Sequence, residues 1–88
     1  MSYQIDGAVI KEQGITFAIA VVKRHVIQNS SEAQSTQNGY RSVFPGVPII
    51  LMAQDSQGTP TYYGRTDIVN FLANIDPNRI PWKRYTVS

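Results

Sequence analysis

Apolar and polar side chains alternate along the first part of the chain, as they do in strands with a buried face. The alternation covers residues 3–10. It returns in residues 15–27, where bulky apolar positions alternate with small ones such as Ala18 and Ala20. A period of two predicts β-strands, and a strand with apolar residues on both sides is typically covered on both faces. We therefore expect an N-terminal antiparallel hairpin.

The length of the hairpin loop decides which side chains share a face of the sheet. A three-residue loop over residues 12–14 pairs Val9 with Phe17 and brings all the large apolar side chains to one face. Gly14 then stands where such a loop needs a left-handed residue. A two-residue loop would divide the large side chains between the faces, so we predict the three-residue loop.

Residues 28–42 are the most polar part of the chain, and only Ala33 and Tyr40 among them are suited to burial. This composition buries too little apolar surface to offset the entropy of ordering the segment. We therefore predict a mobile surface loop. The alternative is a short helix beginning at serines 30–31, since serine caps helices well and Glu32 suits a first turn.

A central strand, a tight turn and an edge strand are predicted next. Residues 49–53 are all apolar, as in a strand buried on both faces. Residues 55–58, DSQG, have the composition of a turn. Residues 59–63 return as a strand nearer an edge of the sheet, because Pro60 lacks a backbone N–H.

The last third of the chain predicts a helix and a final strand. Apolar side chains in residues 66–75 recur at helical spacing, at Ile68, Phe71, Leu72 and Ile75. Residues 80–87 form a further candidate strand, which Pro81 also places at an edge.

Together these elements predict one α+β domain over residues 1–88. Its small, largely antiparallel sheet would have four to five strands, with one main helix packed on one face. The other face, carrying Val22, Ile50 and Met52, would then be exposed. Large exposed apolar patches usually mark interfaces, so we expect a homo-oligomer, most simply a dimer.

Composition and charge limit the chemistry. The chain has no cysteine and one histidine, so we expect no disulfide, no metal site and no cofactor. Its net charge of +2 is low for a dedicated nucleic-acid binder. No apolar run reaches the roughly 18–20 residues of a membrane span, and no signal peptide is recognisable. We expect a soluble, cytoplasmic protein without a membrane partner.

Four residues are candidates for binding a small molecule: Tyr62, Tyr63, Arg65 and Tyr40. Neighbouring side chains of a strand point to opposite faces, which leaves one of the two adjacent tyrosines for a cleft or a subunit contact. Arg65 precedes the predicted helix, where an anion is favoured. Burial and turn formation explain the same residues without a ligand.

A second set resembles a nucleic-acid surface: Lys23, Arg24, Arg79, Trp82, Lys83 and Arg84. Basic side chains neutralise phosphates and aromatic rings stack on bases. Solvated charges around a buried tryptophan explain the same pattern, and we favour that interpretation.

His25 would need an orienting carboxylate to act as a general base. The sequence identifies none, so we interpret His25 as a partly exposed residue at a strand end.

The order GVPII, DSQG, YYGR and DIVNFL in residues 46–72 resembles the C-terminal half of thioredoxin-like domains. In those domains a proline-led strand precedes a hairpin and a closing helix. The chain has no CxxC, so the resemblance implies this order of elements and no thiol redox chemistry.

The sequence thus favours a non-enzymatic, oligomeric protein with a cleft near the polar segment and residues 62–65. The alternatives are a weak nucleic-acid-binding protein and a cofactor-free enzyme. One histidine and six carboxylates leave few ways to assemble a catalytic set, and we assign no catalytic residue.

Overall fold

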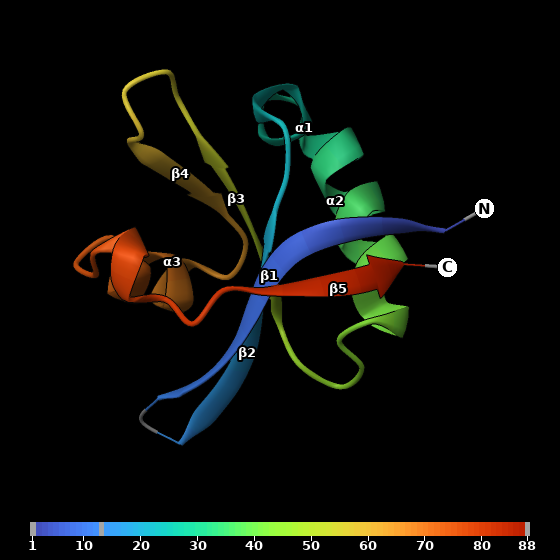
Figure 1. The fold of residues 1–88 in the computed structure, drawn as a ribbon, viewed down its shortest axis with the longest axis horizontal. Helices are drawn as coiled ribbons and strands as arrows, with labels where there is room; N and C mark the ends of the chain where they lie inside the picture. Colours follow the sequence, from blue (N-terminus) through green and yellow to red (C-terminus); the bar gives the residue numbers. More distant parts are fainter. Residues whose placement is uncertain (1, 13, 88) are drawn as a thin grey trace.

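The computed structural model describes residues 2–12 and 14–87, which form a five-stranded sheet of order β4-β3-β2-β1-β5 (Figure 1). The strands are β1 (Tyr3–Glu12), β2 (Ile15–Val21), β3 (Ile49–Gln54), β4 (Pro60–Tyr63) and β5 (Lys83–Val87). All neighbouring strands are antiparallel except β2 and β3, which are parallel. The predicted α+β class with a largely antiparallel sheet is therefore confirmed.

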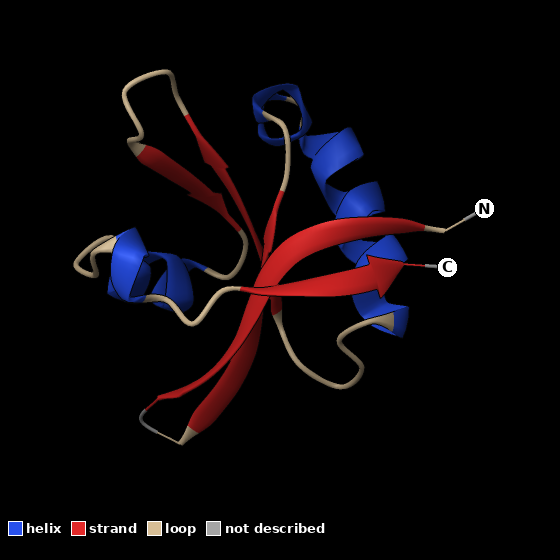
Figure 2. Ribbon diagram, viewed as in Figure 1, coloured by secondary structure: helices blue, strands red, loops and turns tan. Residues whose placement is uncertain are grey.

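Helices cover both faces of the sheet (Figure 2). The connection from β2 to β3 contains α1 (Arg24–Gln28), α2 (Ser30–Gly39) and the 3₁₀ helix η1 (Tyr40–Ser42). These lie on one side, and α3 (Thr66–Leu72) and the 3₁₀ helix η2 (Pro77–Arg79) lie on the other. The parallel pair of strands follows from this crossover, because parallel strands need a long connection.

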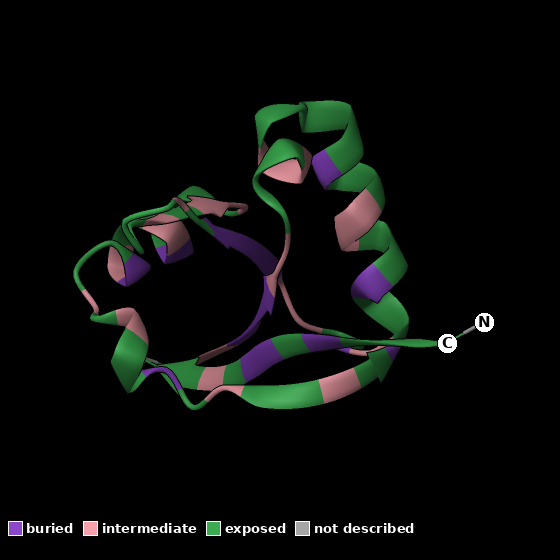
Figure 3. Cartoon of the chain, turned by 45° about the horizontal axis from the view of Figure 1, so that its top comes forward, coloured by how far each residue is buried: buried purple, intermediate pink, exposed green. Residues whose placement is uncertain are grey.

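The core has two parts, one on each face of the sheet, and the buried residues lie on the inward sides of the helices (Figure 3). The side chains of Ile19, Ile50 and Met52 pack under α3. On the opposite face, Ala18 and Ala20 lie under α2 and η1. The small alanines leave room for a helix to approach the sheet closely.

The structure shows a helix where we predicted a loop in residues 28–42. The side chain of Asn29 accepts a hydrogen bond of 3.1 Å from the backbone N–H of Glu32 and caps α2. Ala33 is fully buried and Tyr40 is 6 % exposed. The loop prediction was wrong because these two residues, seven positions apart, fall on one face of the helix and anchor the polar segment.

The register of the N-terminal hairpin differs from the prediction by one residue. Glu12 pairs with Ile15, so the loop has two residues, of which Gln13 lies outside the described residues and Gly14 has a φ of 79°. Val9 leaves the face of the other large side chains and is 46 % exposed. The prediction was wrong because it required one apolar face, whereas this sheet is buried on both faces.

The covered second face removes the reason for which we expected an oligomer. The three residues Val22, Ile50 and Met52 do not share a face: Ile50, which is fully buried, and Met52, which is 2 % exposed, lie under α3 within the single chain. Val22 packs against the core below α1 and α2. The strand that contains Ala20 ends at Val21, and α1 replaces its predicted continuation.

The C-terminal half agrees with its prediction. β3 is buried at every position except its last. β4, which begins at Pro60, and β5, which follows Pro81, are the two edge strands. In α3, Ile68 and Leu72 are buried against the sheet.

Candidate anion-binding groove

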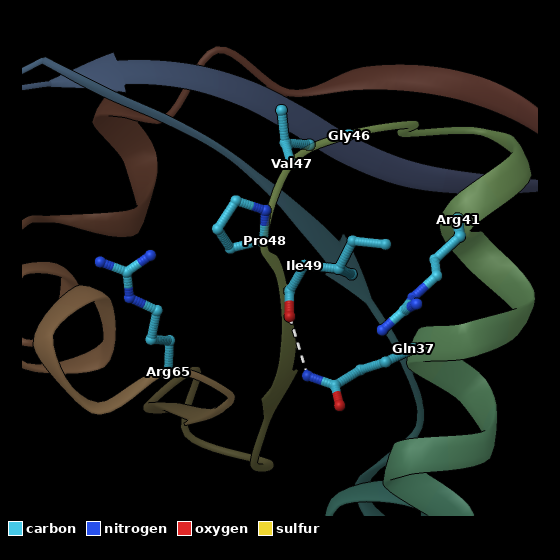
Figure 4. Close-up of a pocket in the computed structure, with 7 residues that line it drawn as sticks. All are labelled: Gln37, Arg41, Gly46, Val47, Pro48, Ile49 and Arg65. Carbon is cyan, nitrogen blue, oxygen red and sulfur yellow. Dashed lines mark hydrogen bonds between the residues drawn. The ribbon is translucent and has the colours of Figure 1, made fainter.

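A groove of about 420 Å³ lies at the start of β3, between α2 and the turn that leads into α3 (Figure 4). Arg41 and Arg65 stand on its two sides, and the segment that enters β3 lies between them. The lining residues are Gln37, Arg41, Gly46, Val47, Pro48, Ile49 and Arg65. None of these is acidic, so the groove favours a negatively charged ligand.

Helix α2 and the 3₁₀ helix after it position one side of the groove. Gln37 and Arg41 are four residues apart, which places them on one flank of a helical segment. The side-chain Nε2 of Gln37 donates a hydrogen bond of 2.8 Å to the carbonyl oxygen of Ile49. This bond fixes α2 against the start of β3 and leaves the Gln37 amide oxygen as an acceptor.

The turn before α3 positions the other side. Arg65 has an extended backbone and precedes the first helical residue. Its Nε and Nη2 donate to the two carboxylate oxygens of Asp67 at 2.9 and 3.0 Å, and this hydrogen bonding lowers the pKa of Asp67. The pair orients the guanidinium group and leaves its Nη1 for a ligand.

Gly64 lets the chain turn closely past β3. Its φ is 153°, and a Cβ atom built there would lie 2.5 Å from Cδ1 of Ile50 and 3.2 Å from the Ile49 carbonyl oxygen. Gly64 therefore serves the backbone geometry that brings Arg65 to the groove.

The structure does not bring the four predicted ligand residues together. Only Arg65 lines the groove. Tyr62 packs with the core under α3, and Tyr63 packs with the opposite part of the core. The buried Tyr62 hydroxyl has no hydrogen-bond partner among the described residues, and burial raises its pKa.

Tyr40 lines a different hollow, of about 690 Å³, on the other flank of α2. Tyr3, Lys23 and His25 also line this hollow. Burial, followed by the influence of the neighbouring Tyr3, raises the pKa of Tyr40 to about 12. The Tyr40 hydroxyl is therefore neutral at any ordinary pH.

Sequence reasoning did not identify Arg41 or Gln37. Their four-residue spacing is a usable signal only once residues 28–42 are taken as a helix.

Sequence reasoning also found no carboxylate near His25, whereas Nε2 of His25 lies 3.4 Å from Oε1 of Glu32. These side chains are 63 % and 45 % exposed, and a contact so exposed contributes little stability.

The residues of the predicted nucleic-acid surface come from three places in the fold. Lys23 precedes α1 and Arg24 is its first residue, Arg79 lies in η2, and Lys83 and Arg84 lie in the edge strand β5. Nε of Arg84 is 3.4 Å from a carboxylate oxygen of Asp6. This surface remains a prediction that no observation tests.

Trp82, the aromatic member of that set, is anchored to the fold. Its indole N–H donates a hydrogen bond of 2.9 Å to the Pro77 carbonyl oxygen, and its ring packs against the core on the α3 side. The tryptophan thus has the structural role that we favoured.

Further features bear on what the molecule can bind. Within residues 2–12 and 14–87, no group of three His, Asp or Glu side chains is placed to hold a metal ion. No helix in that part of the chain combines the length and the apolar character needed to cross a membrane. Comparison of the chain with protein families, characterised proteins and solved structures found no match.

Proposed function

We propose that this protein is a non-enzymatic binding protein that holds a small carboxylate or phosphate between Arg41 and Arg65. The observation that carries the proposal is the groove itself, in which guanidinium groups from two different elements flank a lining without a carboxylate. Guanidinium groups match the geometry of carboxylate and phosphate, to which they can donate two parallel hydrogen bonds.

The groove is partly organised before a ligand binds. Asp67 holds the Arg65 side chain, and the Gln37–Ile49 hydrogen bond holds the helix that leads to Arg41. Fixing such groups in advance lowers the entropy lost on binding. The arginines are exposed, and Asp67 offsets part of the positive charge, so we expect weak binding, with a Kd on the order of 1 mM.

Calorimetric titration of the protein with inorganic phosphate and with acetate tests the proposal. Arg41→Ala and Arg65→Ala should each weaken binding at least several-fold, because each removes a charged hydrogen-bond donor. Arg24→Ala is the matched control, since Arg24 is exposed in α1 and does not line the groove. Equal affinities in all four proteins, or no heat of binding at low salt, would contradict the proposal.

We also retain self-association as part of the proposed function. The faces of the sheet are covered by helices of the same chain, so an interface between copies would have to use another surface.

A further inference from the structure

The outer edge of β1 is paired over only part of its length. β5 pairs with residues 3–7, and this pairing ends where Gly7 faces Lys83. Residues 8–12 pair with β2 on their inner side. Among the described residues, no backbone hydrogen bond reaches the outer side of residues 8–12.

The two-residue loop shows which backbone groups point to this open edge. Glu12 and Ile15 flank the loop and therefore exchange both hydrogen bonds with each other. Backbone groups alternate in direction along a strand. The N–H and C=O groups of Val9 and Lys11 consequently point away from β2, toward the outer edge.

Pro81 explains why β5 does not cover this edge. Extending the β1–β5 register by two residues would place Pro81 opposite Val9, at a position that requires a backbone N–H. Proline has none. The N–H of the next residue, Trp82, donates a hydrogen bond of 2.8 Å to the Ile80 carbonyl oxygen, and the chain turns away from β1.

A groove of about 640 Å³ accompanies the open edge. Phe71 and Ile75 contribute apolar surface, and the charges of Lys11 and Arg79 are balanced by those of Glu12 and Asp76. Val9 also lines the groove and, with Tyr3, is one of the large apolar side chains that the described residues leave exposed. Balanced charges suit a surface that meets its own copy.

We propose that a second copy of this chain pairs its β1 with this edge, antiparallel and about a twofold axis at Ile10. Val9 then exchanges hydrogen bonds with Lys11 of the partner subunit, and Lys11 exchanges them with the partner's Val9. Ile10 faces Ile10 of the partner subunit. The aliphatic stem of Lys11 covers the exposed side chain of the partner's Val9.

Charge and existing strand pairing favour this register of the two β1 strands over registers shifted by two residues. It brings the partner's Glu12 beside Ala8, into the groove that Arg79 lines. A shift of two residues in one direction opposes Lys11 to Lys11 of the partner subunit, which is repulsive. A shift in the other direction requires Gly7, which already pairs with Lys83.

The interface lies outside the anion-binding groove, so this inference does not depend on the proposed anion binding; it names the surface for the proposed self-association. Residues 8–12 are absent from the lining of the groove at β3. A failure of either proposal leaves the other intact.

Light scattering coupled to size-exclusion chromatography over a concentration series tests the pairing. The wild-type protein should reach twice its monomer mass of 9.8 kDa. Val9→Lys should elute as a monomer, because it opposes two like charges. Val9→Glu should keep the dimer, because it faces Lys11 of the partner subunit. A second exchange, Lys11→Glu, should restore the dimer in the Val9→Lys background.

A chemical crosslink supplies an independent measurement. The chain has no cysteine, so Ile10→Cys introduces a single thiol at the twofold axis, at a spacing compatible with a disulfide. Oxidised glutathione should convert this variant to a covalent dimer, whereas Ser56→Cys, in the β3–β4 turn, should form no covalent dimer. The proposal is wrong if the wild type is monomeric at every concentration. It is also wrong if Val9→Lys and Val9→Glu behave alike, or if Ile10→Cys fails to crosslink.

Discussion

The side-chain amide of Gln37 lies 2.8 Å from the carbonyl oxygen of Ile49 and donates a hydrogen bond to it. This contact joins a polar helix to the first residue of a buried strand. It satisfies a carbonyl group at the edge of the core and fixes the side of the groove that carries Arg41.

Removing this contact should destabilise the protein. We expect Gln37→Ala to lower the free energy of unfolding by about 1–3 kcal/mol, because the Ile49 carbonyl oxygen loses a partly buried hydrogen bond. Gln34→Ala, on the exposed side of the same helix, should be nearly neutral. Urea denaturation of the two variants measures the difference, and equal midpoints would contradict this role for Gln37.

Gly7 should tolerate no side chain. A Cβ atom there would lie 2.8 Å from the Ile19 carbonyl oxygen and 3.2 Å from the ring of Phe44. That ring also packs edge-on against Tyr85, with their centroids 4.8 Å apart. We expect Gly7→Ala to cost about 1–3 kcal/mol through overpacking.

Gly39 is the matched control for this exchange. It ends α2 with a helical φ of −64°, and an added Cβ would meet no atom within 4 Å. Gly39→Ala should therefore raise stability, by about 0.5–1 kcal/mol, since alanine is the better helix former. If both exchanges change the urea midpoint equally, the close contacts around Gly7 do not cause the destabilisation by Gly7→Ala.

Tyr40 should make stability fall at alkaline pH. Burial raises its pKa in the folded protein to about 12, whereas the unfolded value lies near 10. Between these values the folded state holds the proton more tightly than the unfolded state. The stabilisation is therefore fully present below about pH 10 and is lost as the pH rises toward 12, by at most about 1.4 kcal/mol per pH unit.

Tyr40→Phe tests this dependence, because it keeps the ring and removes the ionisable hydroxyl. Urea midpoints measured from pH 9 upward should fall less steeply in the variant than in the wild type. Some slope should persist, since burial also raises the pKa of Tyr62. The same slope in both proteins would rule out Tyr40 as a source of the pH dependence.

The sequence predicted the C-terminal half of the fold well because its signals are local. The apolar run of residues 49–53, the helical spacing of Ile68 and Leu72 and the prolines at 60 and 81 each act within a few residues. Each was found where the pattern placed it. Pro81 also leaves the outer edge of β1 unpaired at Val9. The sequence alone did not reveal this effect, because it depends on the register of β1 and β5, which are distant in the chain.

The prediction for residues 28–42 was wrong because their composition does not determine whether they are ordered. Asn29 caps the helix, and Ala33 and Tyr40 anchor it to a face of the sheet that only the tertiary structure defines. The groove, too, could be predicted only in part. Arg65 was identified from its place before a helix, whereas Arg41 gains its role from the position of α2 against β3.

The central claim is that a small anion binds between Arg41 and Arg65. The most direct measurement is a titration of the ¹⁵N-labelled protein with sodium phosphate at constant ionic strength, with sodium chloride as the reference, followed by amide chemical shifts. We predict saturable shifts concentrated at Arg41, Gly46, Val47 and Arg65, and their loss in the Arg41→Ala, Arg65→Ala double variant. Shifts that are absent, fail to saturate or persist in the double variant would contradict the claim.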